Sequence, residues 1–178
     1  MEKKEAKHLS KVLKASAMSL GMCKQGIEEW QDYKSADELC EHYWDGIEFI
    51  IEHPGWPSNE WLVNNIGLET LNRNGIFIDQ TVREVNPPLA VFNGKCSGSV
   101  VADNFSAPEF YVRHNSNISI NAKDAAIVHV NVYDNASVEI TCDRFAKCYV
   151  YQYGGTVKIL NGDGDVKVRD RRPENLKD

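Results

Sequence analysis

The feature that most constrains this chain is a regular alternation of apolar and polar residues in its second half. From residue 110 onward, two apolar residues flanking a single other residue recur every 8 to 10 positions, with Asn, Asp and Gly turn formers between them. The pairs are Phe110/Val112, Ile118/Ile120, Val128/Val130, Val138/Ile140, Cys148/Val150, Val157/Ile159 and Val166/Val168. This pattern predicts a series of short strands, each with one face buried.

Two architectures place strands at this spacing: an antiparallel meander of hairpins and a β-solenoid with two short strands per rung. A solenoid should repeat its turns at twice the strand spacing, whereas a meander has no reason to do so. Turns of one kind start at His114, Tyr133 and Tyr153, which are 19 and 20 residues apart, and turns of the other kind start at Asp124 and Asp143, 19 apart. The sequence therefore favours the solenoid.

Strand pairing distinguishes the two architectures. In a solenoid Val130 lies beside Val150, whereas in a meander it pairs antiparallel with Val138. The solenoid also predicts a buried set consisting of Val130, Val138, Ile140, Val150, Val157 and Ile159.

The first part of the chain is predicted to be helical. Ser35 and Glu38 have the spacing of a capping box, and His53-Pro54-Gly55 is a stop signal, so a helix is expected over about residues 36–52. The predicted fold is α+β: an acidic, Trp-rich helical head over residues 1–88, a C-terminal β-solenoid of short two-strand rungs over 89–170, and a charged tail over 171–178. The antiparallel β-meander is the alternative for the second domain.

Charge and tryptophan are concentrated in the helical head. Residues 25–60 contain ten acidic residues and a single lysine, and all four tryptophans lie between residues 30 and 61. The tryptophans either form a core beneath a solvated helix face or are presented with the acids to a basic partner. The candidate partner-binding surface consists of Glu28, Glu29, Asp32, Glu41, Asp45 and Glu48.

The solenoid turns provide a second candidate surface. Equivalent side chains of successive rungs lie about 4.8 Å apart, so His114, Tyr133 and Tyr153 are expected to form an exposed aromatic column at one corner. Such a column either covers backbone or binds a sugar ring or a partner. Asp124 and Asp143 would also align, either as local backbone caps or as the paired carboxylates of a carbohydrate-active β-helix.

No motif for catalysis, cofactors or metals is found. The five histidines lack metal-ligand spacing, and the five cysteines are odd in number and far apart, which is typical of buried thiols. There is no signal-peptide pattern and no apolar stretch long enough for a membrane span. We therefore expect a cytoplasmic protein without cofactors that is not an enzyme. The net charge of −6 argues against direct binding of nucleic acid or an anionic membrane.

Four segments carry a resemblance to known proteins. They are Trp56-Pro57-Ser58-Asn59-Glu60, Asn74-Gly75-Ile76-Phe77-Ile78-Asp79, Tyr111-Val112-Arg113-His114-Asn115-Ser116 and Val130-Asn131-Val132-Tyr133-Asp134-Asn135-Ala136. Over residues 25–170 the chain resembles small proteins, typical of phages and mobile elements, that join a helical head to a β-solenoid. In architecture alone the second half is similar to bactofilins, which are polymer-forming β-solenoids. The resemblance implies no active site.

Three functions are consistent with these features. The first is a non-catalytic interaction protein, for example a phage-type inhibitor that uses its acidic head to occupy the basic nucleic-acid-binding surface of a host defence nuclease. The second is a self-assembling structural solenoid, and the third is a carbohydrate-binding or carbohydrate-active β-helix. Charged residues and Pro173 follow the last predicted strand, which argues against endless stacking and for a closed assembly, most simply a homodimer. The alternative is a monomer in which the tail folds over the strand edge.

Overall fold

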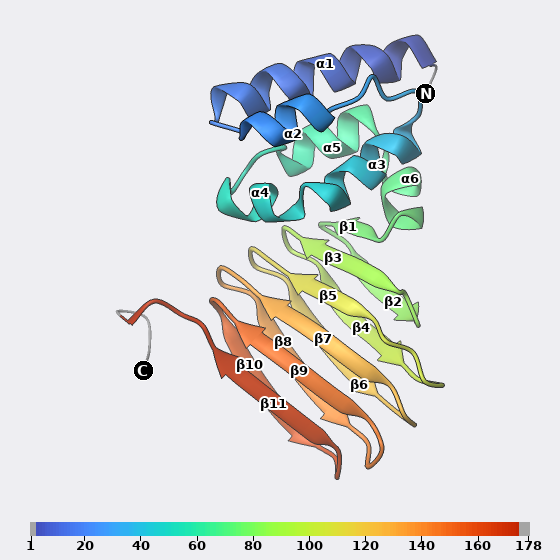
Figure 1. The fold of residues 1–178 in the computed structure, drawn as a ribbon. Coiled ribbons are helices and arrows are strands. Elements are labelled where there is room, and N and C mark those ends of the chain that lie inside the picture. The colour runs from blue at the N-terminus through green and yellow to red at the C-terminus, as the bar shows by residue number, and fades with distance from the viewer. Residues whose placement is uncertain (1–2, 175–178) are drawn as a thin grey trace. The chain divides into compact units, whose positions relative to one another are not determined.

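The chain folds into two compact units. The computed structural model describes residues 3–174 (Figure 1). The units divide between Asn74 and Gly75, the first helical and the second built of strands. The division precedes the residue-88 boundary expected from the sequence, because residues 76–78 and 81–85 already belong to the strands of the second unit. Of the tail expected over residues 171–178, the last four residues lie outside the described part.

The helical unit begins with a helix of 17 residues, which shorter helices of 6 to 10 residues follow. They are α1 (Lys3–Ser19), α2 (Lys24–Glu29), α3 (Ala36–Asp45), α4 (Ile47–Glu52), α5 (Asn59–Asn65) and α6 (Leu68–Arg73). As predicted, α3 begins after Ser35, whose hydroxyl accepts the backbone N–H of Glu38 at 3.1 Å. The single helix expected over residues 36–52 is divided at Gly46, but the backbone bonds from Gly46 to His42 and from Ile50 to Gly46 continue the helical path.

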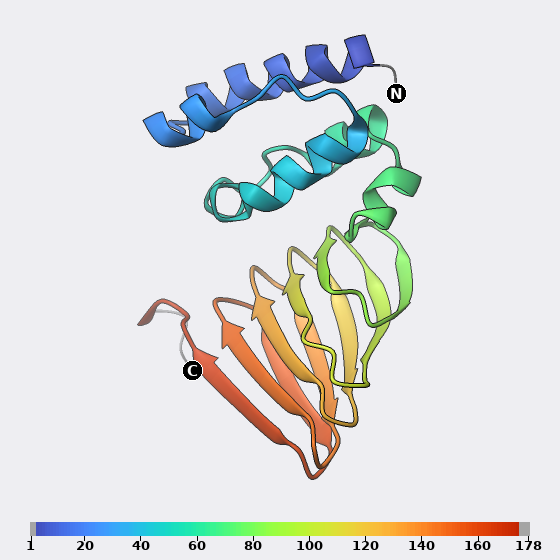
Figure 2. The same cartoon turned by 45° about the vertical axis from the view of Figure 1, so that its right-hand side comes forward.

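The second unit is a β-solenoid. Its strands are β1 (Ile76–Ile78), β2 (Thr81–Val85), β3 (Leu89–Asn93), β4 (Ser97–Ala102), β5 (Glu109–Val112), β6 (Asn117–Ala122), β7 (Ile127–Val132), β8 (Ser137–Cys142), β9 (Lys147–Gln152), β10 (Thr156–Asn161) and β11 (Asp165–Asp170). The odd-numbered strands form one parallel sheet and the even-numbered strands another (Figure 2). Val130 is in register with Val150, which confirms the solenoid and excludes the meander.

The solenoid core consists of inward-facing side chains that stack in register. Val130, Val138, Ile140 and Val150 are completely buried, as predicted. Val157 is only partly buried, and Ile159 is 52% exposed although it is in register with the buried Ile140. The prediction that these two residues are buried is therefore wrong, because they belong to the last rung and no described rung covers them.

One corner of the solenoid is held by side chains that bind the backbone of the preceding rung. His114 Nδ1 accepts the backbone N–H of Gly94 at 2.9 Å, and Asp134 Oδ2 accepts that of His114 at 2.8 Å. Both His114 and Asp134 have left-handed backbone conformations. At the next rung a Cβ on Gly154 would lie 2.6 Å from the Asp134 carbonyl oxygen, so this position has no room for a side chain.

Candidate functional site: an acidic cleft in the helical unit

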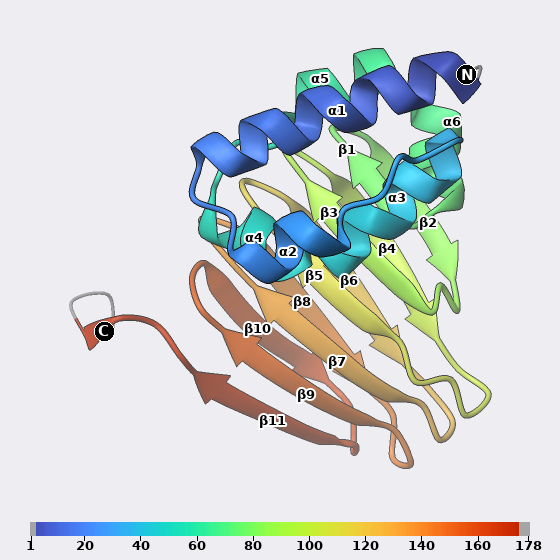
Figure 3. The same cartoon turned by 45° about the horizontal axis from the view of Figure 1, so that its top comes forward.

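The helical unit contains a cleft of about 1050 Å³. Residues from the segment between α1 and α2, from α2, from the segment between α2 and α3, and from α3 and α4 line it, and Figure 3 shows the course of these elements. Seven carboxylates line the cleft with a single lysine, Lys34. The acidic lining consists of Glu29, Asp32, Glu38, Glu41, Asp45, Glu48 and Glu52. The cleft is therefore strongly acidic.

Five of these carboxylates form a stripe along α3 and α4. Glu38, Glu41, Asp45, Glu48 and Glu52 follow one another at alternating spacings of three and four residues, which places them on one face of a helix. Leu39, Tyr43 and Ile50 are buried on these helices. The same helical segment thus contributes to the core of the unit and to the acidic wall of the cleft.

The carboxylates differ in the contacts they already make. Asp32 forms an ion pair with Lys7 at 2.7 Å, and the resulting hydrogen bond lowers the pKa of Asp32. Glu38 accepts the backbone N–H of Lys34 at 2.7 Å. The remaining four of the stripe form no ion pair with the described part of the chain. This group, which we call the open carboxylates, consists of Glu41, Asp45, Glu48 and Glu52.

Aromatic rings line the cleft beside the carboxylates. The ring of His42 contacts both Trp30, at a centroid distance of 4.2 Å, and Tyr33, at 4.7 Å. The rings of Phe49 and His53, which also line the cleft, have a centroid distance of 4.0 Å. The burial of His42 lowers its pKa, against an opposing influence from Asp45. His42 therefore adds no positive charge to the cleft at neutral pH.

Tryptophan indoles hold the walls of the cleft in place. The buried Trp30 donates its indole N–H to Ser10 Oγ at 3.0 Å, and Ser10 in turn donates to the carbonyl of Gln31 at 3.0 Å. Trp56 donates to Ser16 Oγ at 2.9 Å. These bonds connect α1 to the segments on either side of α3 and α4. Trp30 and Trp56 therefore connect parts of this unit. Trp30 is buried, as the interpretation of a tryptophan core expects, whereas Trp44, Trp56 and Trp61 are half-buried.

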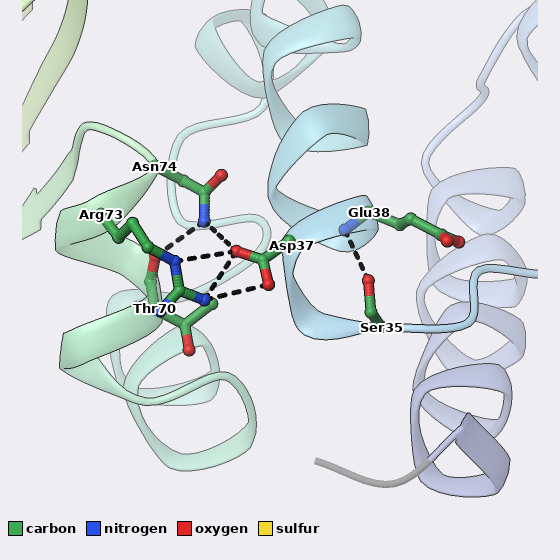
Figure 4. Close-up of polar contacts among 6 residues, drawn as sticks. All are labelled: Ser35, Asp37, Glu38, Thr70, Arg73 and Asn74. Atoms are coloured by element: carbon green, nitrogen blue, oxygen red, sulfur yellow. Dashed lines mark hydrogen bonds and ion pairs between the residues drawn. The ribbon is translucent and has the colours of Figure 1, made fainter.

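A polar cluster outside the cleft fixes the start of α3 against the end of α6 (Figure 4). Asp37 accepts two hydrogen bonds from the Arg73 Nη2 atom, at 2.8 and 2.9 Å, and one from Asn74 Nδ2 at 2.8 Å. These bonds, that from Asn74 first, lower the pKa of the Asp37 carboxyl group. The cluster orients α3, and with it the carboxylate stripe.

Five of the six acidic residues singled out from the sequence line the cleft: Glu29, Asp32, Glu41, Asp45 and Glu48. Glu28 is not among the lining residues and forms an ion pair with Lys24 at 3.6 Å. Glu38 and Glu52 were missed, as were the rings of Tyr33, His42 and Phe49. The regular three-and-four spacing of the carboxylates was a signal in the sequence that could have identified the first two.

The aromatic corner column is only partly formed. Tyr133 and Tyr153 stack with a centroid distance of 4.7 Å and an angle of 1° between the rings. His114 does not continue the stack: the register of Val112 with Val132 puts Arg113 at the position equivalent to Tyr133. His114 is instead equivalent to Asp134 and bonds to the backbone. The prediction of a three-ring column is therefore wrong. Tyr133 and Tyr153 form a stacked pair, in which each ring covers one face of the other.

The expected carboxylate pair on the solenoid is not in register either. Ala122 pairs with Cys142, twenty positions on, so Asp143 is equivalent to Lys123 and not to Asp124. The turn hydrogen bonds confirm this register: the backbone N–H of Ala126 donates to the carbonyl of Lys123, and that of Ala146 donates to the carbonyl of Asp143. Asp124 instead accepts the backbone N–H of Asn104 at 3.5 Å. Asp124 therefore caps the backbone of the preceding rung, and not that of its own turn as expected.

The described residues contain no cluster of three or more His, Cys, Asp or Glu side chains able to hold a metal ion. Burial raises the pKa of the Cys40 thiol to about 12 and also raises that of Cys148. These thiols are therefore protonated at neutral pH and unsuited to act as nucleophiles. Five of the seven carboxylates of the cleft follow one another along α3 and α4, an arrangement suited to a ligand with several positive charges.

Comparison of the chain with protein-family models, with curated proteins and with solved structures gives no match.

Among the residues that the structure describes, no helix combines the length and the apolarity needed to cross a lipid bilayer.

Proposed function

We propose that this protein is a non-catalytic interaction protein that binds a basic segment of a partner protein in the acidic cleft of its helical unit. The observation that carries the proposal is the stripe of carboxylates along a cleft of about 1050 Å³, four of which have no ion pair with the described residues. Arginine and lysine side chains would supply the missing counter-charges, and the rings of Tyr33 and Phe49 would contact their aliphatic or guanidinium portions.

The stripe is unfavourable for the helices that bear it. Like charges three or four residues apart destabilise a helix by about 0.2–0.5 kcal/mol per pair. Glu41, Asp45, Glu48 and Glu52 form three such successive pairs. A stripe that lowers the stability of the isolated protein, and in which four carboxylates have no counter-ion among the described residues, is expected where a partner supplies the counter-ions.

The partner class follows from the charge pattern. A polyanion is repelled by the cleft, whereas a protein with a basic nucleic-acid-binding channel is complementary to it. The resemblance to phage and mobile-element proteins supports a specific version of the proposal, in which the cleft blocks the basic channel of a host defence nuclease. In that case nucleic acid and this protein compete for the same surface of the partner.

The test is peptide binding by fluorescence anisotropy, with a short labelled peptide rich in lysine and arginine as the probe. The variant Glu41→Gln/Asp45→Asn/Glu48→Gln removes three of the open carboxylates. The matched control, Glu5→Gln/Glu60→Gln/Glu69→Gln, changes the net charge equally at exposed positions outside the cleft.

We expect the cleft variant to bind at least about tenfold more weakly than the wild type, and the control variant to bind within about twofold of it. Binding by the wild type should also weaken with added salt. Equal losses in the two variants would show a non-specific charge effect and overturn the proposal. The nuclease version is tested by adding nucleic acid to the complex with the natural partner: unchanged binding would overturn that version alone.

A further inference from the structure

The last rung of the solenoid presents core side chains to solvent. Val168 is 41% exposed, whereas its in-register neighbour Val150 is completely buried. The same contrast holds for Ile159 against Ile140. Apolar side chains that form an inward ladder elsewhere are therefore uncovered at this end, together with the backbone groups of the outer strand edges.

The two outer strands differ in their ability to accept another strand. The pairing of β10 with β8 is interrupted by a register shift between Ile159 and Asn161, and such an irregularity disfavours further pairing. β11 pairs with β9 without interruption over all six of its residues, and no described strand pairs with its other side (Figure 2). The backbone N–H of Arg171 continues this pairing by donating to Gln152, so the tail begins by extending β11. β11 is the regular, open edge.

The sequence of β11 is complementary to itself in one antiparallel register. If two copies pair about Lys167, Asp165 lies opposite Arg169 and Val166 lies opposite Val168, twice each by symmetry. Both contacts match chemically: opposite charges meet on the outer face and apolar side chains meet on the inner face. Lys167 then lies opposite Lys167 of the second copy, but each Lys167 already forms an ion pair with Asp165 of its own chain at 3.2 Å.

The neighbouring registers that keep inner and outer faces matched are poorer. Pairing about Val166 leaves only residues 165–167 of the strand paired and places Val168 opposite Gly164. Pairing about Val168 brings Lys167 opposite Arg169 twice, which places like charges together. The register about Lys167 pairs five of the six residues of β11.

We propose that a second copy of this chain pairs antiparallel with β11 about Lys167, forming a closed, two-fold symmetric dimer that joins two solenoids end to end. The contact covers Val166 and Val168 of both copies and continues the core and the sheet of odd-numbered strands across the interface. Because each copy uses the same edge, the dimer leaves no β11 edge free for a third copy, and the assembly does not propagate into a filament. The proposal does not depend on the function of the acidic cleft.

The test uses charge reversal and sedimentation equilibrium of the full chain. Asp165→Arg and Arg169→Asp each place like charges together twice, so each variant alone should associate at least about tenfold more weakly than the wild type. Mixing the two variants restores both Asp–Arg contacts, so an equimolar mixture should form a heterodimer. The double variant Asp165→Arg/Arg169→Asp should also dimerise. Circular dichroism verifies that each variant is folded.

A matched control reverses an ion pair on the other sheet, between β10 in the last rung and β8 in the rung before it. Lys158 and Glu139 contact each other at 3.1 Å within one chain, so Lys158→Glu/Glu139→Lys should leave the dimer unchanged. Val168→Asp places a charge in the apolar contact and should yield a monomer. A wild type that is monomeric at all concentrations, or filamentous, would overturn the proposal. Failure of the two charge-reversal variants to combine would overturn the register and with it this dimer.

Discussion

The solenoid and the helical unit achieve stability in different ways. In the solenoid each inward position is supported by the equivalent position of the neighbouring rung, so that Ile120, Ile140 and Ile159 form one ladder. In the helical unit, single polar contacts such as Trp30 to Ser10 and Asp37 to Arg73 connect segments far apart in the sequence. Repetition makes a regular scaffold, whereas contacts made once allow an irregular cleft with four carboxylates that form no ion pair with the described residues.

The largest expected effect comes from breaking the ladder within the stack. Ile140→Ala leaves a cavity among completely buried side chains and should lower the free energy of unfolding by about 2–5 kcal/mol. Ile159→Ala, one rung further along the same ladder, should cost far less because half of this side chain is already exposed. Denaturant unfolding followed by circular dichroism measures both. Similar losses for the two variants would contradict a ladder that ends at the last rung.

The next effect sharpens the contrast from the side of the helical unit. Trp30→Phe removes the indole N–H that Ser10 accepts in a buried position and should destabilise this unit by about 1–2 kcal/mol. Hydrogen exchange of the solenoid strands should remain unchanged, since Trp30 and its partner Ser10 both lie in the helical unit. Ser10→Ala should not add its full cost to that of Trp30→Phe, because both remove the same hydrogen bond.

Both units should lose stability on mild acidification, each through its own histidine. Burial lowers the pKa of His42 in the helical unit and of His114 in the solenoid. Each histidine contributes fully to the free energy of unfolding above about pH 6.5, where its side chain is neutral in the unfolded state as well. This contribution is lost as the pH falls from there through the lowered pKa of the folded state.

The two histidines can be separated by substitution. His42→Gln should flatten the pH dependence seen by tryptophan fluorescence, and His114→Gln that seen by hydrogen exchange of the solenoid. A variant that flattens the profile of the other unit would contradict the assignment.

The smallest effect has the opposite sign. Neutralising Glu41, Asp45 and Glu48 relieves like-charge repulsion along the stripe and should stabilise the helical unit by roughly 0.5–1 kcal/mol. Thermal unfolding by tryptophan fluorescence should therefore show a slightly higher Tm at low salt and no gain at high salt. A lower Tm would mean that the stripe has a structural role.

The sequence by itself determined the parts of the structure that depend on local pattern. The alternation of apolar residues and the doubled turn spacing predicted the solenoid, since each rung repeats the same local arrangement. Ser35 and Glu38 marked the start of α3 because capping depends on residues close in the chain. The carboxylate stripe was also present as a pattern, at helical spacing.

The tertiary structure alone decided which of these residues come together. One rung advances twenty residues and the next nineteen, so Ser137 pairs with Asn117 but also with Thr156. A spacing of nineteen therefore did not reveal that His114 is equivalent to Asp134, or Asp143 to Lys123. In the helical unit Trp30 donates to Ser10, twenty residues apart, and no local pattern encodes that contact. The exposure of Ile159 likewise reflects its position in the last rung, because its local sequence pattern matches that of the buried Ile140.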